Sequence, residues 1–257
     1  MSPDIPVLIS AFIAGTFFGS FFYTLALRFA SGLIVRNPLR ALFSRSHCPL
    51  CGAVPGSLFM VPLLGWFFSA GKCRSCGGRI PVLYPLWELA YGLLAVVVLQ
   101  VNGPSLNTLF VYLICCTALC IAIIDFMTMT VPDSMLAVLL LLSVYPVVNR
   151  GMFLDSFYGF LLLSVFFLMV MLIFPGAFGA GDLKYYAVAG ILLGLEQSVV
   201  LLEVSLVSGA VCGVLWVLVK RGSLRQKIPF APFISAALVI TLLFGGRIAL
   251  MYYNMVY

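Results

Sequence analysis

Two aspartates stand beside long apolar runs: Asp125 in AIIDFMTMTVPD and Asp182 in GAFGAGDLK. Isolated charges are costly close to lipid, so a carboxylate in such a place is a candidate functional group. Two carboxylates that share one proton can hydrolyse a peptide bond, because the ionised one takes a proton from water while the protonated one donates to the scissile carbonyl. The alternative is that Asp182 only caps the helix that follows it.

Glycines surround the second aspartate. Gly176, Gly179 and Gly181 leave its approach without side chains, which would let an extended substrate peptide come close. The sequence offers little support for other kinds of catalytic site. His47 is the only histidine, which argues against a Ser-His-Asp triad, and the sequence contains no HExxH, GxGxxG or P-loop motif.

Four cysteines form a second constellation. HCPLCG and KCRSCG hold Cys48 and Cys51, then Cys73 and Cys76, with 21 residues between the pairs. This spacing predicts a tetrahedral four-thiolate site for structural Zn2+, with a glycine after each pair allowing a tight turn. Two disulfides, a redox pair and replacement of Cys48 by the adjacent His47 are alternatives, although disulfides are rare in the cytosol, where we expect this segment to lie.

The composition indicates which elements carry these groups. The chain has 257 residues, of which 63% are hydrophobic and only 9% charged, too few polar side chains for a water-soluble domain. We predict an all-α polytopic membrane bundle of about eight spans, of which the fourth and sixth are short. The expected spans are Ile5–Leu27, Val82–Val101, Leu106–Phe126, Ser134–Val148, Leu154–Phe174, Leu183–Leu195, Ser198–Val219 and Phe230–Met251.

Basic residues predict the orientation. The segment from Arg28 to Pro81 holds seven of them and no acid: Arg28, Arg36, Arg40, Arg45, Lys72, Arg74 and Arg79. If the spans alternate, Lys184, Lys220, Arg221, Arg225 and Lys227 fall on the same side, which makes 12 of 14. The positive-inside rule then puts this side in the cytoplasm and both termini outside. The expected parts are a first span (1–27), a cytoplasmic zinc-binding loop (28–81) and a membrane core (82–257), with Asp125 and Asp182 at the same cytoplasmic depth.

These motifs together resemble the type IV prepilin peptidases, a family of intramembrane aspartic peptidases with a GxGD element. The resemblance runs from about Gly19 to Ala236. It rests on GSF, Arg28, HCPLCG, PLLGW, GKCRSCG, YPLWE, IDFMTMTVPD, GAGDLK and IPFAPF, in that order.

The resemblance implies a function for several residues. Asp125 and Asp182 would be the catalytic pair of an endopeptidase that removes the basic leader of prepilins or pseudopilins at the cytoplasmic face of the bacterial inner membrane. Such enzymes serve type IV pilus and type II secretion systems, and many also methylate the new N-terminus with S-adenosylmethionine. Lys184 matches the family's lysine and would bias Asp182 or anchor the inner side. Glu88 matches YPxxE and would pair with an arginine of the loop, holding the loop against the bundle.

Two segments depart from the family's pattern. Residues 57–61 are SLFMV, where many members have a polar, aromatic run, and Phe174 and Pro175 replace a lysine-glutamate pair. Both departures leave the aspartates intact and concern the methyltransferase activity. Two functions of other classes remain open from the residues alone: a proton-coupled transporter with the aspartates as a relay, and a zinc-ribbon membrane adaptor. We expect no nucleic-acid partner, because no aromatic residues interleave with the loop arginines.

Overall fold

A computed structural model describes residues 3–36, 44, 46–48, 50–176, 178–220 and 228–256. These residues form helices, turns and one isolated antiparallel bridge between Lys72 and Arg79, with no strand among them. The described part of the chain divides into two compact units, residues 1–108 and 109–257. Several basic residues of the topology argument lie outside the described residues: Arg40, Arg45, Arg221, Arg225 and Lys227.

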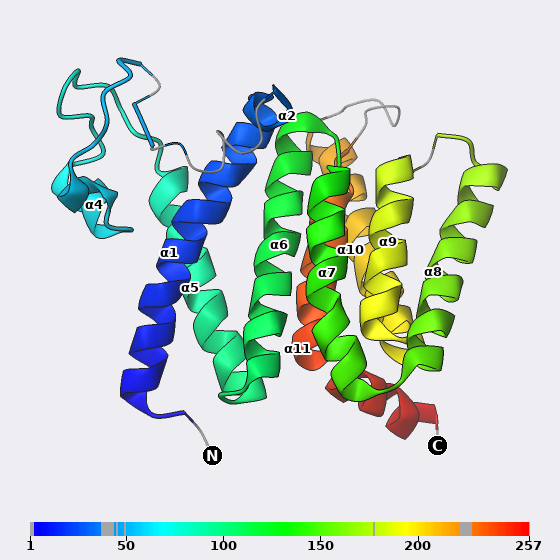
Figure 1. Cartoon of the computed structure of the whole chain (residues 1–257). Coiled ribbons are helices and arrows are strands. Elements are labelled where there is room, and N and C mark those ends of the chain that lie inside the picture. Colours follow the sequence, from blue (N-terminus) through cyan, green and yellow to red (C-terminus); the bar gives the residue numbers. More distant parts are fainter. Residues whose placement is uncertain are drawn as a thin grey trace. The chain divides into compact units, whose positions relative to one another are not determined.

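The first unit is built on two long helices and the loop between them. It contains α1 (Ile5–Ala30), α2 (Leu33–Arg36), η1 (Ser57–Met60), α4 (Leu64–Phe68) and α5 (Leu83–Asn102). Figure 1 shows α1 in dark blue running along α5 in teal, with α4 in the loop that joins them.

Small residues bring α1 and α5 together. A Cβ added to Gly15 would lie 2.8 Å from the Cα of Gly92, and one added to Gly19 would lie 2.8 Å from the Cα of Glu88. Gly15 and Gly19 form a GxxxG motif, which lets two membrane helices pack backbone to backbone. The sequence reasoning overlooked this motif, although the spacing alone could have revealed it.

The described residues of the second unit form six helices. They are α6 (Leu106–Thr128), which begins at the boundary between the units, α7 (Asp133–Arg150), α8 (Phe153–Ile173), α9 (Ala180–Leu193), α10 (Leu195–Lys220) and α11 (Ala231–Val256). Successive helices alternate in direction (Figure 1). Helix α9 packs against α7, α8, α10 and α11, and is therefore the central element of this unit. Gly159 of α8 and Gly190 of α9 face each other so closely that a Cβ on either would lie 2.5 Å from the other's carbonyl oxygen.

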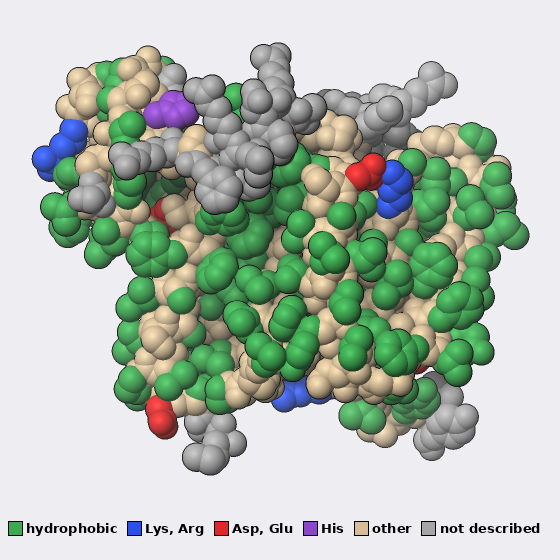
Figure 2. All heavy atoms as spheres, in the orientation of Figure 1, with side chains coloured by type: hydrophobic (Ala, Val, Ile, Leu, Met, Phe, Trp, Pro, Cys, Tyr) green, Lys and Arg blue, Asp and Glu red, His purple; other side chains and the backbone are tan. Residues whose placement is uncertain are grey.

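The helices have the length and composition of membrane spans. Within the described part of the chain, seven helices are long and apolar enough to cross a bilayer: α1, α5, α6, α7, α8, α10 and α11. Hydrophobic side chains cover most of the helical surface visible in Figure 2, where charged side chains are few. The prediction of an all-α polytopic membrane protein is confirmed.

The remaining expected span corresponds to α9. With 14 residues it extends about 21 Å, less than the roughly 30 Å of a bilayer core. It nevertheless starts at the end where α8 finishes and runs back beside it (Figure 1). The short sixth span expected from the sequence is therefore present as a short helix enclosed by its neighbours.

Candidate active site and metal centre

Asp125 lies in the last turn of α6, and its side chain is buried, with 4% of its surface exposed. Its Oδ2 accepts a hydrogen bond of 3.1 Å from the backbone N–H of Ala231, the first residue of α11. A helix N-terminus carries partial positive charge, so this contact favours the ionised carboxyl. Ala231 belongs to the IPFAPF motif, for which the sequence offered no role.

Asp182 lies in the first turn of α9, where Gly179 is the N-cap residue. Its Oδ2 accepts a hydrogen bond of 3.0 Å from the backbone N–H of Gly179. This is one half of a capping box, in which the side chain of the third helical residue reaches back to the N-cap. The alternative that Asp182 caps a helix is therefore correct in part, and it is compatible with a second role.

The fold brings the two aspartates together. They are 57 positions apart in the sequence, yet their carboxyls are close enough to interact electrostatically. Both hydrogen bonds described above use Oδ2, and both come from the N-terminus of a helix. Repulsion between the two carboxyls disfavours ionising both at once, while each of them accepts a hydrogen bond from a helix end that favours its ionised form.

The glycines before Asp182 differ in what surrounds them. A Cβ on Gly181 would lie 3.0 Å from the Cβ of Val131, so this glycine lets the start of α9 pack on the loop after α6. A Cβ on Gly179 would lie 3.5 Å from Oδ2 of Asp182. Of these two, Gly179 keeps the surroundings of the carboxyl open, whereas Gly181 serves close packing.

Lys184 pairs with an acid that the sequence reasoning did not assign. Its Nζ lies 2.8 Å from Oδ1 and 3.0 Å from Oδ2 of Asp133, the first residue of α7. Both side chains are largely exposed. The pair links α9 to the start of α7, so Lys184 is placed to anchor the first turn of α9, which carries Asp182.

The four cysteines of the loop converge on one point. Their sulfurs all lie within 4.8 Å of one another, and the pairs Cys48–Cys76 and Cys51–Cys73 are 3.9 Å apart. Tetrahedral zinc with Zn–S bonds of about 2.3 Å requires sulfurs about 3.8 Å apart, whereas a disulfide requires about 2.05 Å. The cluster therefore fits a metal, and the cysteines are free. His47 is not part of the group.

Two equivalent turns present these sulfurs. In the first turn, the N–H of Cys48 donates to the carbonyl of Ala53, and the N–H of Gly52 donates to the carbonyl of Cys48. In the second turn, Cys73 donates to Gly78 and Gly77 donates to Cys73 in the same way. All four distances are 2.8–2.9 Å. Gly52 and Gly77 both have φ of +71°, a conformation that favours glycine, as the sequence predicted. Backbone N–H groups of Cys76 and Ser75 lower the pKa of Cys73 to about 6, whereas the neighbouring thiols outweigh the lowering effect of the Gly78 N–H and raise the pKa of Cys76 to about 11. The metal-free cluster therefore holds its protons unequally.

Glu88 ties this loop to α5. Its buried Oε2 accepts a hydrogen bond of 2.7 Å from the backbone N–H of Leu63, and its carboxyl also bonds the hydroxyl of Ser20. Leu63 has φ of +62°, a strained conformation for a residue other than glycine. Glu88 thus holds the loop, as expected from the sequence. Its described partners are a backbone amide and a serine in place of the expected arginine.

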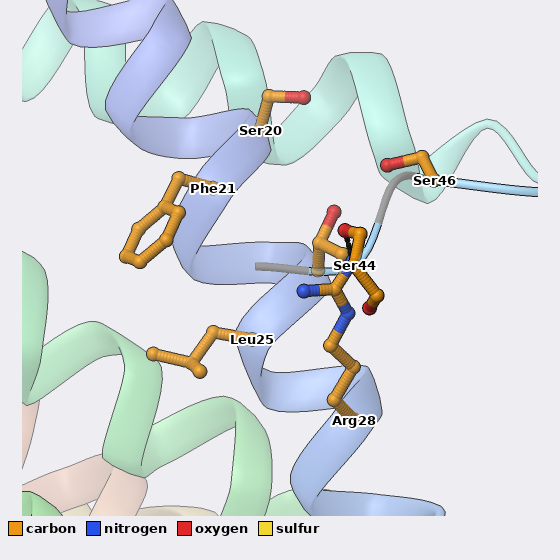
Figure 3. A pocket seen from close by; sticks show the side chains of 7 residues that line it. Ser20, Phe21, Leu25, Arg28, Ser44 and Ser46 are labelled. Carbon is orange, nitrogen blue, oxygen red and sulfur yellow. Dashed lines mark hydrogen bonds between the residues drawn. The ribbon is translucent and has the colours of Figure 1, made fainter. Parts of the chain in front are cut away.

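Arg28 connects the loop to the other long helix of this unit, α1. Its Nη2 donates a hydrogen bond of 2.8 Å to the carbonyl of Ser44. Figure 3 shows this contact at a small cavity of about 180 Å³, lined by Ser20, Phe21, Thr24, Leu25, Arg28, Ser44 and Ser46. The loop is therefore attached to both long helices of the first unit.

The fold is that of a polytopic helical membrane protein, with two aspartates that each accept a hydrogen bond from a helix end and a cluster of four cysteines that could hold a metal. A family model described as the type IV leader peptidase family matches residues 112–214, and one described as the bacterial peptidase A24 N-terminal domain matches residues 13–101. The first match contains both aspartates and the second contains all four cysteines.

Three relatives that share one name extend this result. A prepilin leader peptidase/N-methyltransferase of Bacillus subtilis is 32% identical over 253 residues, covering 95% of this chain and 97% of the relative. Proteins of that name from Aeromonas salmonicida and Burkholderia pseudomallei are 32% and 34% identical, covering 81% and 78% of this chain and 74% and 67% of their own lengths. No solved structure matches the chain.

The chain therefore belongs to the type IV leader peptidase family. The resemblance inferred from the motifs is confirmed. This membership favours the peptidase over the transporter and the zinc-ribbon adaptor that the residues alone left open.

Proposed function

We propose that this protein is a membrane aspartic endopeptidase that removes the leader peptide of type IV prepilins or pseudopilins. The observation that carries this proposal is the pairing of Asp125 and Asp182 at the N-termini of α11 and α9, in a chain whose relatives are named for that reaction. The basic leader stays in the cytoplasm, and the scissile bond lies at the cytoplasmic face of the bacterial inner membrane. This orientation is supported by the distribution of basic residues.

The proposed chemistry uses one proton shared by the two carboxyls. The ionised carboxylate takes a proton from a water molecule, whose oxygen attacks the scissile carbonyl, while the protonated carboxyl donates to the carbonyl oxygen. When the tetrahedral gem-diol collapses and the C–N bond breaks, the carboxyl that took a proton from water gives it to the leaving nitrogen, and the other carboxylate takes a proton back from a hydroxyl of the gem-diol, so the dyad again holds one proton. The N–H groups of Ala231 and Gly179 hold the two carboxyls in place.

The other residues have supporting functions in this proposal. Gly179 keeps the substrate side of Asp182 open, Gly181 lets α9 pack on Val131, and Lys184 anchors the first turn of α9 to Asp133. Cys48, Cys51, Cys73 and Cys76 hold structural Zn2+, because four thiolates leave no position for a reacting water. Glu88 holds the zinc-binding loop.

Methylation of the new N-terminus is a second proposed activity, with S-adenosylmethionine as the donor. It is supported by the name of the relatives, which includes N-methyltransferase. Incubation of purified protein with a prepilin and S-adenosylmethionine tests it, since the cleaved product should then gain the mass of one methyl group. A product that stays unmethylated would show that this chain is a peptidase only.

Substitution of each aspartate by asparagine tests the peptidase. Asp125→Asn and Asp182→Asn keep the shape but remove the ionisable oxygen, so each should slow cleavage about 10^3-fold or more, with the double variant little worse because the pair acts as a unit. The pH–rate profile of the parent should be bell-shaped. Glu196→Gln is the control, because Glu196 is an exposed acid in the first turn of α10 that has no function in the proposal. Near-normal cleavage by either asparagine variant would show that the dyad is wrong.

A further inference from the structure

The loop that carries the metal centre leaves an apolar surface exposed. Leu58 of η1 and Leu64, Phe67 and Phe68 of α4 are 73, 52, 67 and 67% exposed, and we call these four residues the interfacial patch. Large apolar side chains gathered in this way mark an interaction site. What they contact follows from their height relative to the membrane spans and from the charges around them.

The hydrogen bond to Glu88 fixes this height. Leu63, immediately before α4, donates its N–H to Glu88, which is five residues beyond the first residue of α5. At a rise of 1.5 Å per residue, Glu88 lies about 7.5 Å along α5 from its start. Since α5 is itself long and apolar enough to be a membrane span, the start of α4 is held beside the first turns of that span. Figure 1 shows α4 level with these turns.

This height corresponds to the border between lipid headgroups and acyl chains. Interfacial helices bury their apolar face about 5–10 Å into this border. Phe67 and Phe68 follow Leu63 by four and five residues, so they remain near the same height. If Phe67 and Phe68 faced water, the exposure of their apolar surface would be unfavourable. Contact with lipid removes this surface from water.

The charged residues of the loop itself are all basic. Lys72, Arg74 and Arg79 are exposed in the same loop, and the guanidinium of Arg74 stacks on the ring of Phe59 at 4.2 Å. Residues 28–81 contain no aspartate or glutamate. Basic side chains beside exposed aromatic residues are the pattern of segments that bind anionic membrane surfaces.

We propose that the interfacial patch is a lipid-binding site, and that α4 lies in the headgroup region with its aromatic side chains among the acyl chains of anionic phospholipids. The metal loop is thus attached to the membrane at three places: Arg28 on α1, Glu88 on α5 and the patch on the bilayer itself. The lipid contact fixes the height of the metal centre above the membrane independently of substrate.

Photo-crosslinking in lipid nanodiscs tests the proposal with the full chain. p-Benzoylphenylalanine is placed at Phe67, at Leu168 on the exposed surface of α8 as a lipid-facing reference, and at Ser75 as an exposed loop position outside the patch. Lipid adducts are counted by intact mass. We expect adducts at Phe67 to approach those at Leu168, to exceed those at Ser75 several-fold, and to increase when phosphatidylglycerol replaces part of the phosphatidylcholine.

Several results would overturn the proposal. Adducts at Phe67 no more frequent than at Ser75 would place α4 in water. Equal adducts with and without phosphatidylglycerol would remove the anionic preference. A protein adduct that replaces the lipid adduct when prepilin is present would make the patch a substrate-docking surface. Because the readout is lipid mass, each outcome is independent of whether the protein cleaves prepilin.

Discussion

Removing the carboxyl of Glu88 should release the metal-binding loop from α5. In Glu88→Ala, the N–H of Leu63 loses its acceptor, which lies 2.7 Å away on a buried side chain. A hydrogen bond to a charged group contributes about 1.5–3 kcal/mol, and each 1.4 kcal/mol is a tenfold change in an equilibrium. The positive φ of Leu63 adds to the effect, because a strained backbone persists only while its surroundings hold it.

Hydrogen exchange measures this release directly. In nanodisc-embedded protein, the amide of Leu63 should exchange about 10- to 100-fold faster in Glu88→Ala than in the parent, since local opening becomes easier by the energy of the lost bond. Glu88→Gln keeps an acceptor oxygen without the charge and should show an intermediate rate. Arg28→Gln is the matched control, because it removes the contact to Ser44 and leaves the Leu63 bond intact.

The refuting result is simple to recognise. If Leu63 exchanges at the parent rate in Glu88→Ala, the carboxylate does not hold the loop, and the height of α4 that rests on this bond is wrong as well. Acceleration confined to Ser44 and its neighbours in Arg28→Gln would show that the two attachments act separately.

Further predictions concern the packing of the site and its metal. Gly181→Ala places a Cβ 3.0 Å from Val131 and should lower stability by about 1–3 kcal/mol, seen as a lower Tm in detergent; Val131→Ala should restore part of the loss, and an unchanged Tm would contradict the contact. Double substitution of Lys184 and Asp133 should give a coupling energy below about 1 kcal/mol, because the pair is exposed; a larger value would mean that the pair is shielded. Cys73→Ser should reduce bound zinc, measured by elemental analysis, well below about one ion per chain, and it should lower the yield. The folded fraction of this variant should retain more cleavage activity than Asp182→Asn. If Cys73→Ser binds as much zinc as the parent, the four-cysteine site is excluded.

Local properties of the sequence determined much of this protein. The long apolar runs predicted the helices, because burial in lipid requires a continuous apolar stretch and leaves the backbone to bond within the helix. The two C-x2-C pairs with their glycines predicted the metal cluster, because the turn that aims two sulfurs at one point is set by residues close together in the chain. The alternation of the spans predicted that Asp125 and Asp182 lie at the same membrane depth, because each of them stands at the same end of its pair of helices.

The partners of these groups were decided only by the tertiary structure. Ala231 donates to Asp125 from 106 residues away, Asp133 pairs with Lys184 from 51 residues away, and Leu63 donates to Glu88 from 25 residues away. Two of these three contacts use a backbone N–H, which every residue except proline possesses, so no residue type marks the donor in the sequence. Which helix end or loop comes within 3 Å of a carboxylate depends on how helices pack against each other, and this information is spread over the whole chain.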